Sequence, residues 1–130
     1  MNYQHIQYHV NDPVATITLN RPDALNAITA RMQAEMKHAL AAAENDRAGV
    51  GIVLTGAGRG FSAGADIGGL QATAGGESAA REDLTEFKAD PGNPEMGDNF
   101  SVTFSYLLSI SKPLIAAVNG PCAGLGFADA

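Results

Sequence analysis

Residues 51–67 read GIVLTGAGRGFSAGADI. The stretch begins with a short, β-branched, apolar run, which predicts a strand buried on both faces of a parallel sheet, and continues into a loop rich in glycine and alanine. A second such run, Leu114 to Asn119, predicts another buried strand and enters the glycine loop 120–126 (GPCAGLG). At the carboxyl ends of parallel strands, small residues let a ligand approach the backbone, and a following helix offers unpaired N–H donors. Two such loops can converge on one oxygen and form an oxyanion hole.

The chain before this stretch predicts a β-hairpin and one helix. Alternating apolar and polar residues on either side of Asn11-Asp12-Pro13 predict two strands, at 3–10 and 14–19. Thr29 is the expected N-cap of a helix that runs to about Asn45. Its apolar residues recur every three or four positions, as expected for one buried face: Ile28, Met32, Met36, Leu40 and Ala43.

The region between the two glycine loops differs in composition. From about residue 71 to 99 it is rich in Ala, Gly, Glu, Asp and Pro, so we predict a mobile surface insertion with a short helix near residues 82–88. Phe100, Phe104, Leu107 and Leu108 then recur at helical spacing until Lys112-Pro113 ends the helix. Strands that alternate with helical crossovers in this order are typical of an α/β protein.

Composition limits the classes of protein to consider. The 130 residues are 45% hydrophobic and 17% charged, as in one soluble globular domain. Cys122 is the only cysteine, and no segment resembles a signal peptide, so we expect no internal disulfide and a cytoplasmic location. No apolar run approaches the roughly 20 residues of a membrane span. The net charge of -6, with scattered basic residues, argues against a nucleic-acid partner and means that a phosphorylated ligand is held by local contacts.

Neither glycine loop is a nucleotide-binding motif. Residues 56–60 (GAGRG) are followed by Phe61, where a dinucleotide fingerprint needs a third small residue. Residues 124–129 (GLGFAD) end in aspartate at the corresponding position, and the chain contains no Gly-Lys-Ser/Thr sequence of a P-loop. A dinucleotide-binding module is therefore disfavoured, and nicotinamide binding measured by fluorescence would be needed to revive it.

Together the motifs resemble the crotonase superfamily, the enoyl-CoA hydratase/isomerase family, over nearly the whole chain. The matching segments, in the family's order and spacing, are LNRP with ALNA (19–22 and 24–27), IVLTG (52–56), FSAGADI (61–67) and KPLIAAVNG (112–120). The resemblance implies a spiral of ββα units, of which residues 1–130 form the N-terminal part of a single domain. It also implies a full-length protein about twice as long, assembled as a homotrimer or a dimer of trimers.

The same resemblance implies an acyl-CoA thioester substrate from fatty acid metabolism, with no metal and no cofactor beyond the coenzyme A of the substrate. Matched residue by residue, the backbone N–H groups of Ala65 and Leu125 are the oxyanion donors. Leu125 stands where the family usually has glycine, so its side chain must point away from the thioester. The positions that match the family's CoA pocket are Ala24, Leu25, Ala63, Asp66 and Ile67. Asp66 is also a candidate helix N-cap. Asp23 stands where hydratases commonly have lysine, and a carboxylate at this position cannot pair with the diphosphate of CoA.

The acid and base groups for hydration are not all present. Hydration of an enoyl thioester suits two carboxylates, and the residue that matches the first hydratase glutamate is Ala128. Its neighbour Asp129 is rotated by about 100° around the expected helix. We interpret His5, His9 and His38 as surface or structural histidines. The pattern favours isomerisation or another single-base reaction, with the base after residue 130. The alternative is a non-catalytic acyl-CoA-binding relative or an inactive fragment. A carboxylate in the sequence after residue 130 would disfavour this alternative.

Overall fold

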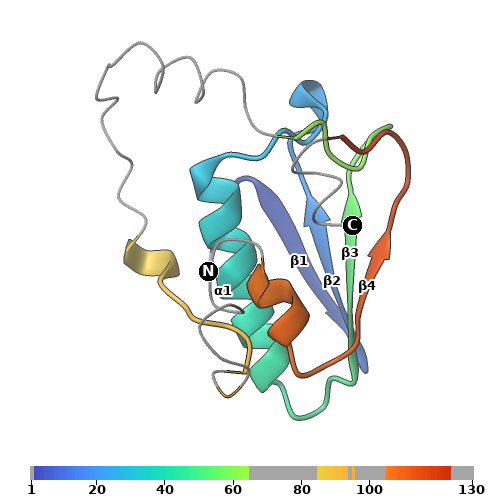
Figure 1. The fold of residues 1–130 in the computed structure, drawn as a ribbon. Helices are drawn as coiled ribbons and strands as arrows, with labels where there is room; N and C mark the ends of the chain where they lie inside the picture. Colours follow the sequence, from blue (N-terminus) through green and yellow to red (C-terminus); the bar gives the residue numbers. More distant parts are fainter. Residues whose placement is uncertain (1, 65–84, 94, 96–104, 124–130) are drawn as a thin grey trace.

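The computed structural model describes residues 2–64, 85–93, 95 and 105–123 of the chain. Within these residues, a four-stranded sheet carries one long helix across one of its faces (Figure 1). The strands follow one another across the sheet in the order β1-β2-β3-β4. None of the helices in the described ranges is long and apolar enough to cross a membrane.

The sheet combines an antiparallel hairpin with two parallel additions. β1 (Ile6–Asn11) pairs antiparallel with β2 (Val14–Leu19), which confirms the predicted hairpin. β3 (Gly51–Gly56) lies parallel to β2, and β4 (Leu114–Ala117) lies parallel to β3. Since β2, β3 and β4 run in the same direction, their carboxyl ends meet at one edge of the sheet. The loops at this edge, residues 20–28, 57–64 and 118–123, are called the crest below.

The helix α1 (Ala30–Asn45) has the predicted cap and the predicted end. Thr29 is its N-cap, and the hydroxyl oxygen of Thr29 accepts a hydrogen bond from the N–H of Met32 at 3.0 Å. All five residues of the predicted buried face belong to the core. They share one apolar cluster with residues of β2 and β3, namely Ala15, Ile17, Leu19, Ile52 and Leu54. Helical and strand periodicities in the sequence therefore meet in one core.

Of the two parallel strands that precede the glycine loops, β4 is less buried than predicted. Ile52 and Leu54 of β3 face the core and are 1% and 2% exposed, whereas Ile115 of β4 is 62% exposed. The prediction of a second fully buried strand is therefore wrong for β4 in the described part of the chain. β4 is the outermost strand of the described sheet, and α1 covers only one face. An apolar run in a sequence does not indicate which of its faces a neighbouring element covers.

In the described ranges between the glycine loops lie two short 3₁₀ helices, η2 (Thr85–Phe87) and η5 (Ser105–Ser109). Residues 82–84 and 100–104, which belong to the two longer helices predicted here, lie outside the described ranges. Most of the predicted insertion, 71–99, is also outside them, so its mobility stays a prediction. Within it, Phe87 is 1% exposed and its ring lies 5.0 Å from the guanidinium carbon of Arg31.

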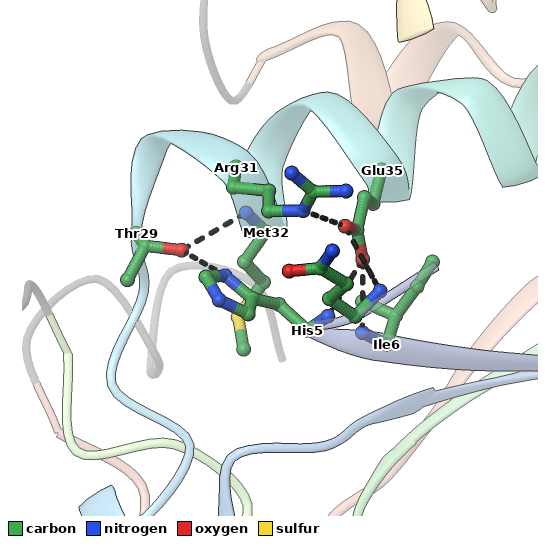
Figure 2. Close-up of polar contacts among 7 residues, drawn as sticks. His5, Ile6, Thr29, Arg31, Met32 and Glu35 are labelled. Carbon is green, nitrogen blue, oxygen red and sulfur yellow. Dashed lines mark hydrogen bonds and ion pairs between the residues drawn. The ribbon is translucent and has the colours of Figure 1, made fainter. Parts of the chain in front are cut away.

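A buried carboxylate joins β1 to α1. Glu35 is fully buried and accepts hydrogen bonds from the backbone N–H groups of Gln4, His5 and Ile6, at 2.7–3.2 Å (Figure 2). Its second oxygen pairs with Nε of Arg31 at 2.6 Å. Because buried carboxylates are costly without partners, this set of four donors is what allows a charge in the core.

The histidines have the structural character predicted for them. Nδ1 of His5 lies 2.6 Å from the Thr29 hydroxyl (Figure 2), and Nδ1 of His38 lies 2.7 Å from the Tyr3 hydroxyl. His9 is exposed on β1. Each of the two hydrogen-bonded rings therefore connects α1 or its N-cap to the start of the chain.

Candidate functional site

The first loop of the crest follows β2 and carries two of the predicted CoA-binding residues. It contains the 3₁₀ helix η1 (Pro22–Ala24), which lies beyond the end of β2 (Figure 1). Leu25 and Asn26 then adopt positive φ angles of 51° and 55°. Ala24 and Leu25 are half-buried, and Asp23 is exposed. The loop therefore reverses direction tightly and presents small and apolar groups at the crest.

The loop after β3 lies against this first loop. The N–H of Ala63 donates to the carbonyl of Leu25 at 2.9 Å, and the N–H of Ile28 donates to the carbonyl of Gly64 at 2.7 Å. Ala63 is exposed, whereas Gly64 is buried. The structure thus brings together three residues predicted to bind CoA, Ala24, Leu25 and Ala63, although they come from loops that are far apart in the sequence.

The two glycine loops run beside each other where they leave the sheet. Ser62 and Cys122 form a parallel bridge beyond the ends of β3 and β4. The carbonyl of Pro121 accepts from the N–H groups of Phe61 and Ser62 at 3.0 and 3.3 Å, and the N–H of Ala123 donates to the carbonyl of Ser62 at 3.0 Å. The parallel pairing of β3 and β4 therefore resumes within the loops.

Asn26 is a structural centre of the crest whose role was not predicted from its side chain. It is fully buried, and its Oδ1 accepts from the N–H of Arg21 at 2.8 Å. Its Nδ2 donates to the carbonyls of Ala57 and Gly60, both at 2.9 Å. The one local feature of the sequence that could have indicated this role is that asparagine is favoured in turns and tolerates positive φ.

A second asparagine and two close-approach glycines complete the packing of the crest. Asn119, two residues after the end of β4, accepts from the N–H of Gly56 at 3.2 Å and donates to the carbonyl of Gly60 at 3.3 Å. A Cβ atom at Gly56 would lie 2.6 Å from that same Gly60 oxygen, and one at Gly120 would overlap the carbonyl of Arg59. Glycine is required at both positions because the backbones approach so closely.

The remaining predicted site residues lie outside the described ranges: Ala65, Asp66, Ile67, Leu125, Ala128 and Asp129. The first glycine loop is described up to Gly64, the residue before the first predicted donor, and the second up to Ala123. The convergence of the two oxyanion donors therefore stays a prediction.

A pocket of about 430 Å³ lies away from the crest, between α1 and residues 85–90. It is lined by Ala34, Lys37, Thr85, Phe87, Lys88, Ala89 and Asp90. None of the described residues predicted to bind substrate, Ala24, Leu25 and Ala63, lines it. The convergence of loops, rather than this pocket, marks the candidate site in the described part of the chain.

Comparison with known proteins shows the same family as the motifs. The chain matches the family model described as enoyl-CoA hydratase/isomerase over residues 9–129. It is 36% identical, over 129 residues, to 1,2-epoxyphenylacetyl-CoA isomerase of Escherichia coli (strain K12). The alignment covers 95% of this chain and 43% of that relative. The chain belongs to the enoyl-CoA hydratase/isomerase family.

Solved structures confirm the fold class. The crystal structure of an enoyl-CoA hydratase/isomerase from Mycobacterium paratuberculosis matches with a TM-score of 0.71 at 35% identity, over 98% of this chain and 45% of that chain. One from Xanthobacter autotrophicus Py2 matches with a TM-score of 0.69 at 32% identity, over 93% of this chain and 40% of that chain. The α/β crotonase fold is thus confirmed, and the chain spans about half the length, or less, of the relatives that it matches.

Proposed function

We propose that the protein carrying this chain binds an acyl-CoA thioester at the crest and stabilises its enolate with the backbone N–H groups of Ala65 and Leu125. The observation that carries the proposal is the parallel bridge between Ser62 and Cys122. Each proposed donor lies three residues beyond one member of this bridge. Chains that run in parallel from paired residues keep equivalent positions close, which supports the convergence of the two donors on one oxygen.

The peptide before the first donor supports the same arrangement. The carbonyl of Gly64 accepts from the N–H of Ile28 at 2.7 Å. A trans peptide holds its C=O and N–H on opposite sides, so the N–H that follows this carbonyl, which belongs to Ala65, is expected to point away from Ile28. That donor is then available to a ligand rather than to the first loop of the crest.

The CoA portion of the substrate is proposed to lie along Ala24, Leu25 and Ala63. These residues are small or apolar, and two backbone hydrogen bonds hold their loops together. Asp23, on the same loop, is exposed and offers no cation to a diphosphate. Arg59 is exposed on the neighbouring loop, where a Cβ atom at Gly58 would lie 3.1 Å from Cβ of Pro22 in η1. Because the two loops lie this close, we propose that the Arg59 guanidinium pairs with the phosphates of CoA.

The proposed reaction is isomerisation or another single-base reaction of the enolate. The methyl group of Ala128 can neither position a water molecule nor transfer a proton, so this position cannot supply the carboxylate of a hydratase. The Escherichia coli relative is named an isomerase, which supports the choice. The base is proposed to lie in sequence that follows residue 130.

The test compares the native protein with its Ala128→Glu variant on the same enoyl-CoA, with Ala128→Gln as a control of similar size without a carboxylate. Hydration is followed by the absorbance of the conjugated thioester, and enolisation by exchange of the α-protons of the saturated acyl-CoA of the same chain length with deuterium. We expect the native protein to exchange the proton but to hydrate poorly, and Ala128→Glu to gain hydration, since one acid/base group contributes about 10²- to 10⁴-fold.

Vigorous hydration by the native protein would refute the proposal of a single-base reaction. Tight binding of acyl-CoA with no exchange of its α-proton would instead favour the non-catalytic binding relative.

A further inference from the structure

Asn26 has a hydrogen-bond partner for every polar group that it carries. In addition to the three bonds of its side-chain amide, its N–H donates to the carbonyl of Arg21 at 2.9 Å. Its own carbonyl accepts from the hydroxyl of Ser62 at 2.9 Å. Asn26 is 0% exposed, so it cannot touch a ligand, and any influence on the site must pass through the loops that it holds.

These bonds lead directly to the first proposed oxyanion donor. The buried Ser62 hydroxyl that donates to Asn26 also accepts from the N–H of Gly64, at 3.3 Å. Gly64 immediately precedes Ala65. On the other side of the loop, the carbonyl of Gly60 is held by two amides, those of Asn26 and Asn119. Residues 60–64, which precede the proposed donor in the sequence, are thus held at Gly60 by the Asn26 amide and at Gly64 through the Ser62 hydroxyl.

The arrangement exceeds what holding the loops together requires. Backbone bonds from Ala63 to Leu25 and from Ile28 to Gly64 already join the two loops. The Asn26 amide adds control of position, because it sets where the carbonyls of Ala57 and Gly60 lie. An oxyanion donor acts at 2.7–3.1 Å from the oxygen, and a misplacement of about 1 Å can cost 10²-fold in rate.

We propose that Asn26 is a positioning residue for the thioester site, whose buried side chain holds residues 57–64 so that the N–H of Ala65 meets the thioester oxygen. The proposal rests on the function proposed above and adds to it a residue outside the substrate pocket. It predicts that changes at Asn26 alter the polarisation of a bound thioester without removing any group that contacts it.

The test uses Asn26→Asp in the native protein. Aspartate keeps the shape, the acceptor for the N–H of Arg21 and a tolerance of positive φ, but it removes both donors and places a carboxylate oxygen against two carbonyls. Lys112→Met is the matched control, because Nζ of Lys112 bonds to the carbonyls of Ala43 and Asp46, at the opposite end of the sheet from the crest.

The decisive readout is the infrared carbonyl stretch of a bound acyl-CoA with ¹³C at the thioester carbon. The band of the bound ligand is separated from that of free acyl-CoA by subtracting the spectrum of the free ligand, so a smaller folded fraction lowers the intensity of the bound band but does not move its frequency. We expect the native protein and Lys112→Met to shift the stretch to lower frequency. Asn26→Asp should lose most of that shift, and its kcat should fall by about 10²-fold with little change in KM.

A second variant keeps the test decisive if Asn26→Asp does not fold. Ser62→Ala removes only the hydroxyl between the Asn26 carbonyl and the Gly64 N–H, and we expect a partial loss of the shift. A native carbonyl frequency in the folded variants would overturn the positioning role. The absence of any shift, or of acyl-CoA binding, in the native protein would instead overturn the proposed function, so the two failures are distinguishable.

Discussion

Replacing Glu35 with glutamine tests how far the junction between β1 and α1 depends on a buried charge. Glutamine has nearly the same shape and keeps one oxygen that can accept from the backbone N–H groups of residues 4–6. It loses the second carboxylate oxygen, which pairs with Nε of Arg31 at 2.6 Å, and places an amide donor there. Arg31 is 8% exposed, so water does not readily replace its partner.

The expected cost follows from this one lost interaction. Removing one partner of a buried ion pair costs about 3 to 5 kcal/mol, because the remaining charge stays buried and loses the strongest of its compensating contacts. Arg31 also lies over the ring of Phe87 at 5.0 Å, and this contact remains in the variant. We therefore expect the lower end of the range, a loss of about 3 kcal/mol in the free energy of unfolding.

The assay is urea unfolding of the native protein and of the variant, with an unchanged m-value as evidence that only stability has changed. Hydrogen exchange of the amides of residues 4–6 reports whether the loss is local. Glu44→Gln is the control, since the Glu44 carboxylate accepts from the N–H groups of Gly92 and Ser111 but is only half-buried. Its loss should be about 1 kcal/mol. A Glu35→Gln loss no larger than that of the control would refute the reasoning.

Two further predictions concern Gly56 and Tyr3. In Gly56→Ala the new methyl group would lie 2.6 Å from two backbone carbonyl oxygens, so thermal unfolding should show a loss of about 1 to 3 kcal/mol, and an unchanged melting temperature would contradict the packing. Burial, with smaller contributions from Tyr8 and Glu35, raises the pKa of Tyr3 above its usual 10.0. As the pH rises, Tyr3 therefore ionises in the unfolded chain before it ionises in the folded protein. The stability that is present below pH 10 is lost as the pH rises through the pKa of the folded state. Tyr3→Phe should weaken this alkaline loss in urea unfolding measured from about pH 9 to 11, and identical pH profiles would count against it.

The elements of the fold that depend on local patterns were predictable. The hairpin and α1 each follow from a periodicity within about 20 residues, and the Thr29 cap follows from its own side chain. The exposure of Ile115 was not predictable in this way, because it depends on which elements cover β4. The apolar composition of a strand indicates that it can be buried on both faces but not where its covering layers come from.

The candidate site was predictable to a different extent. The glycine loops predicted where the backbone is open to a ligand, and the resemblance assigned residues to roles; both stay predictions, whereas the pairing of the two loops through Ser62 and Cys122 is observed. The partners of Asn26 were hidden, because the carbonyls of Ala57 and Gly60 are backbone groups that any residue would supply. Sequence can show that an asparagine suits a turn, but only the fold shows which carbonyls its amide reaches.

The use of backbone donors explains how one scaffold can carry different reactions. Substituting a side chain at Ala65 or Leu125 does not remove its N–H group, so the proposed stabilisation of the enolate survives most changes in the pocket. The acid and base groups, by contrast, are side chains, and a single substitution such as alanine for glutamate at position 128 removes one of them. Under the proposed function, what must be preserved is the geometry of the donors, and the proposed positioning role assigns this requirement to buried residues such as Asn26, which have no contact with the substrate. Mutations at such positions should therefore impair every reaction of the site, whereas mutations at position 128 should change which reaction it performs.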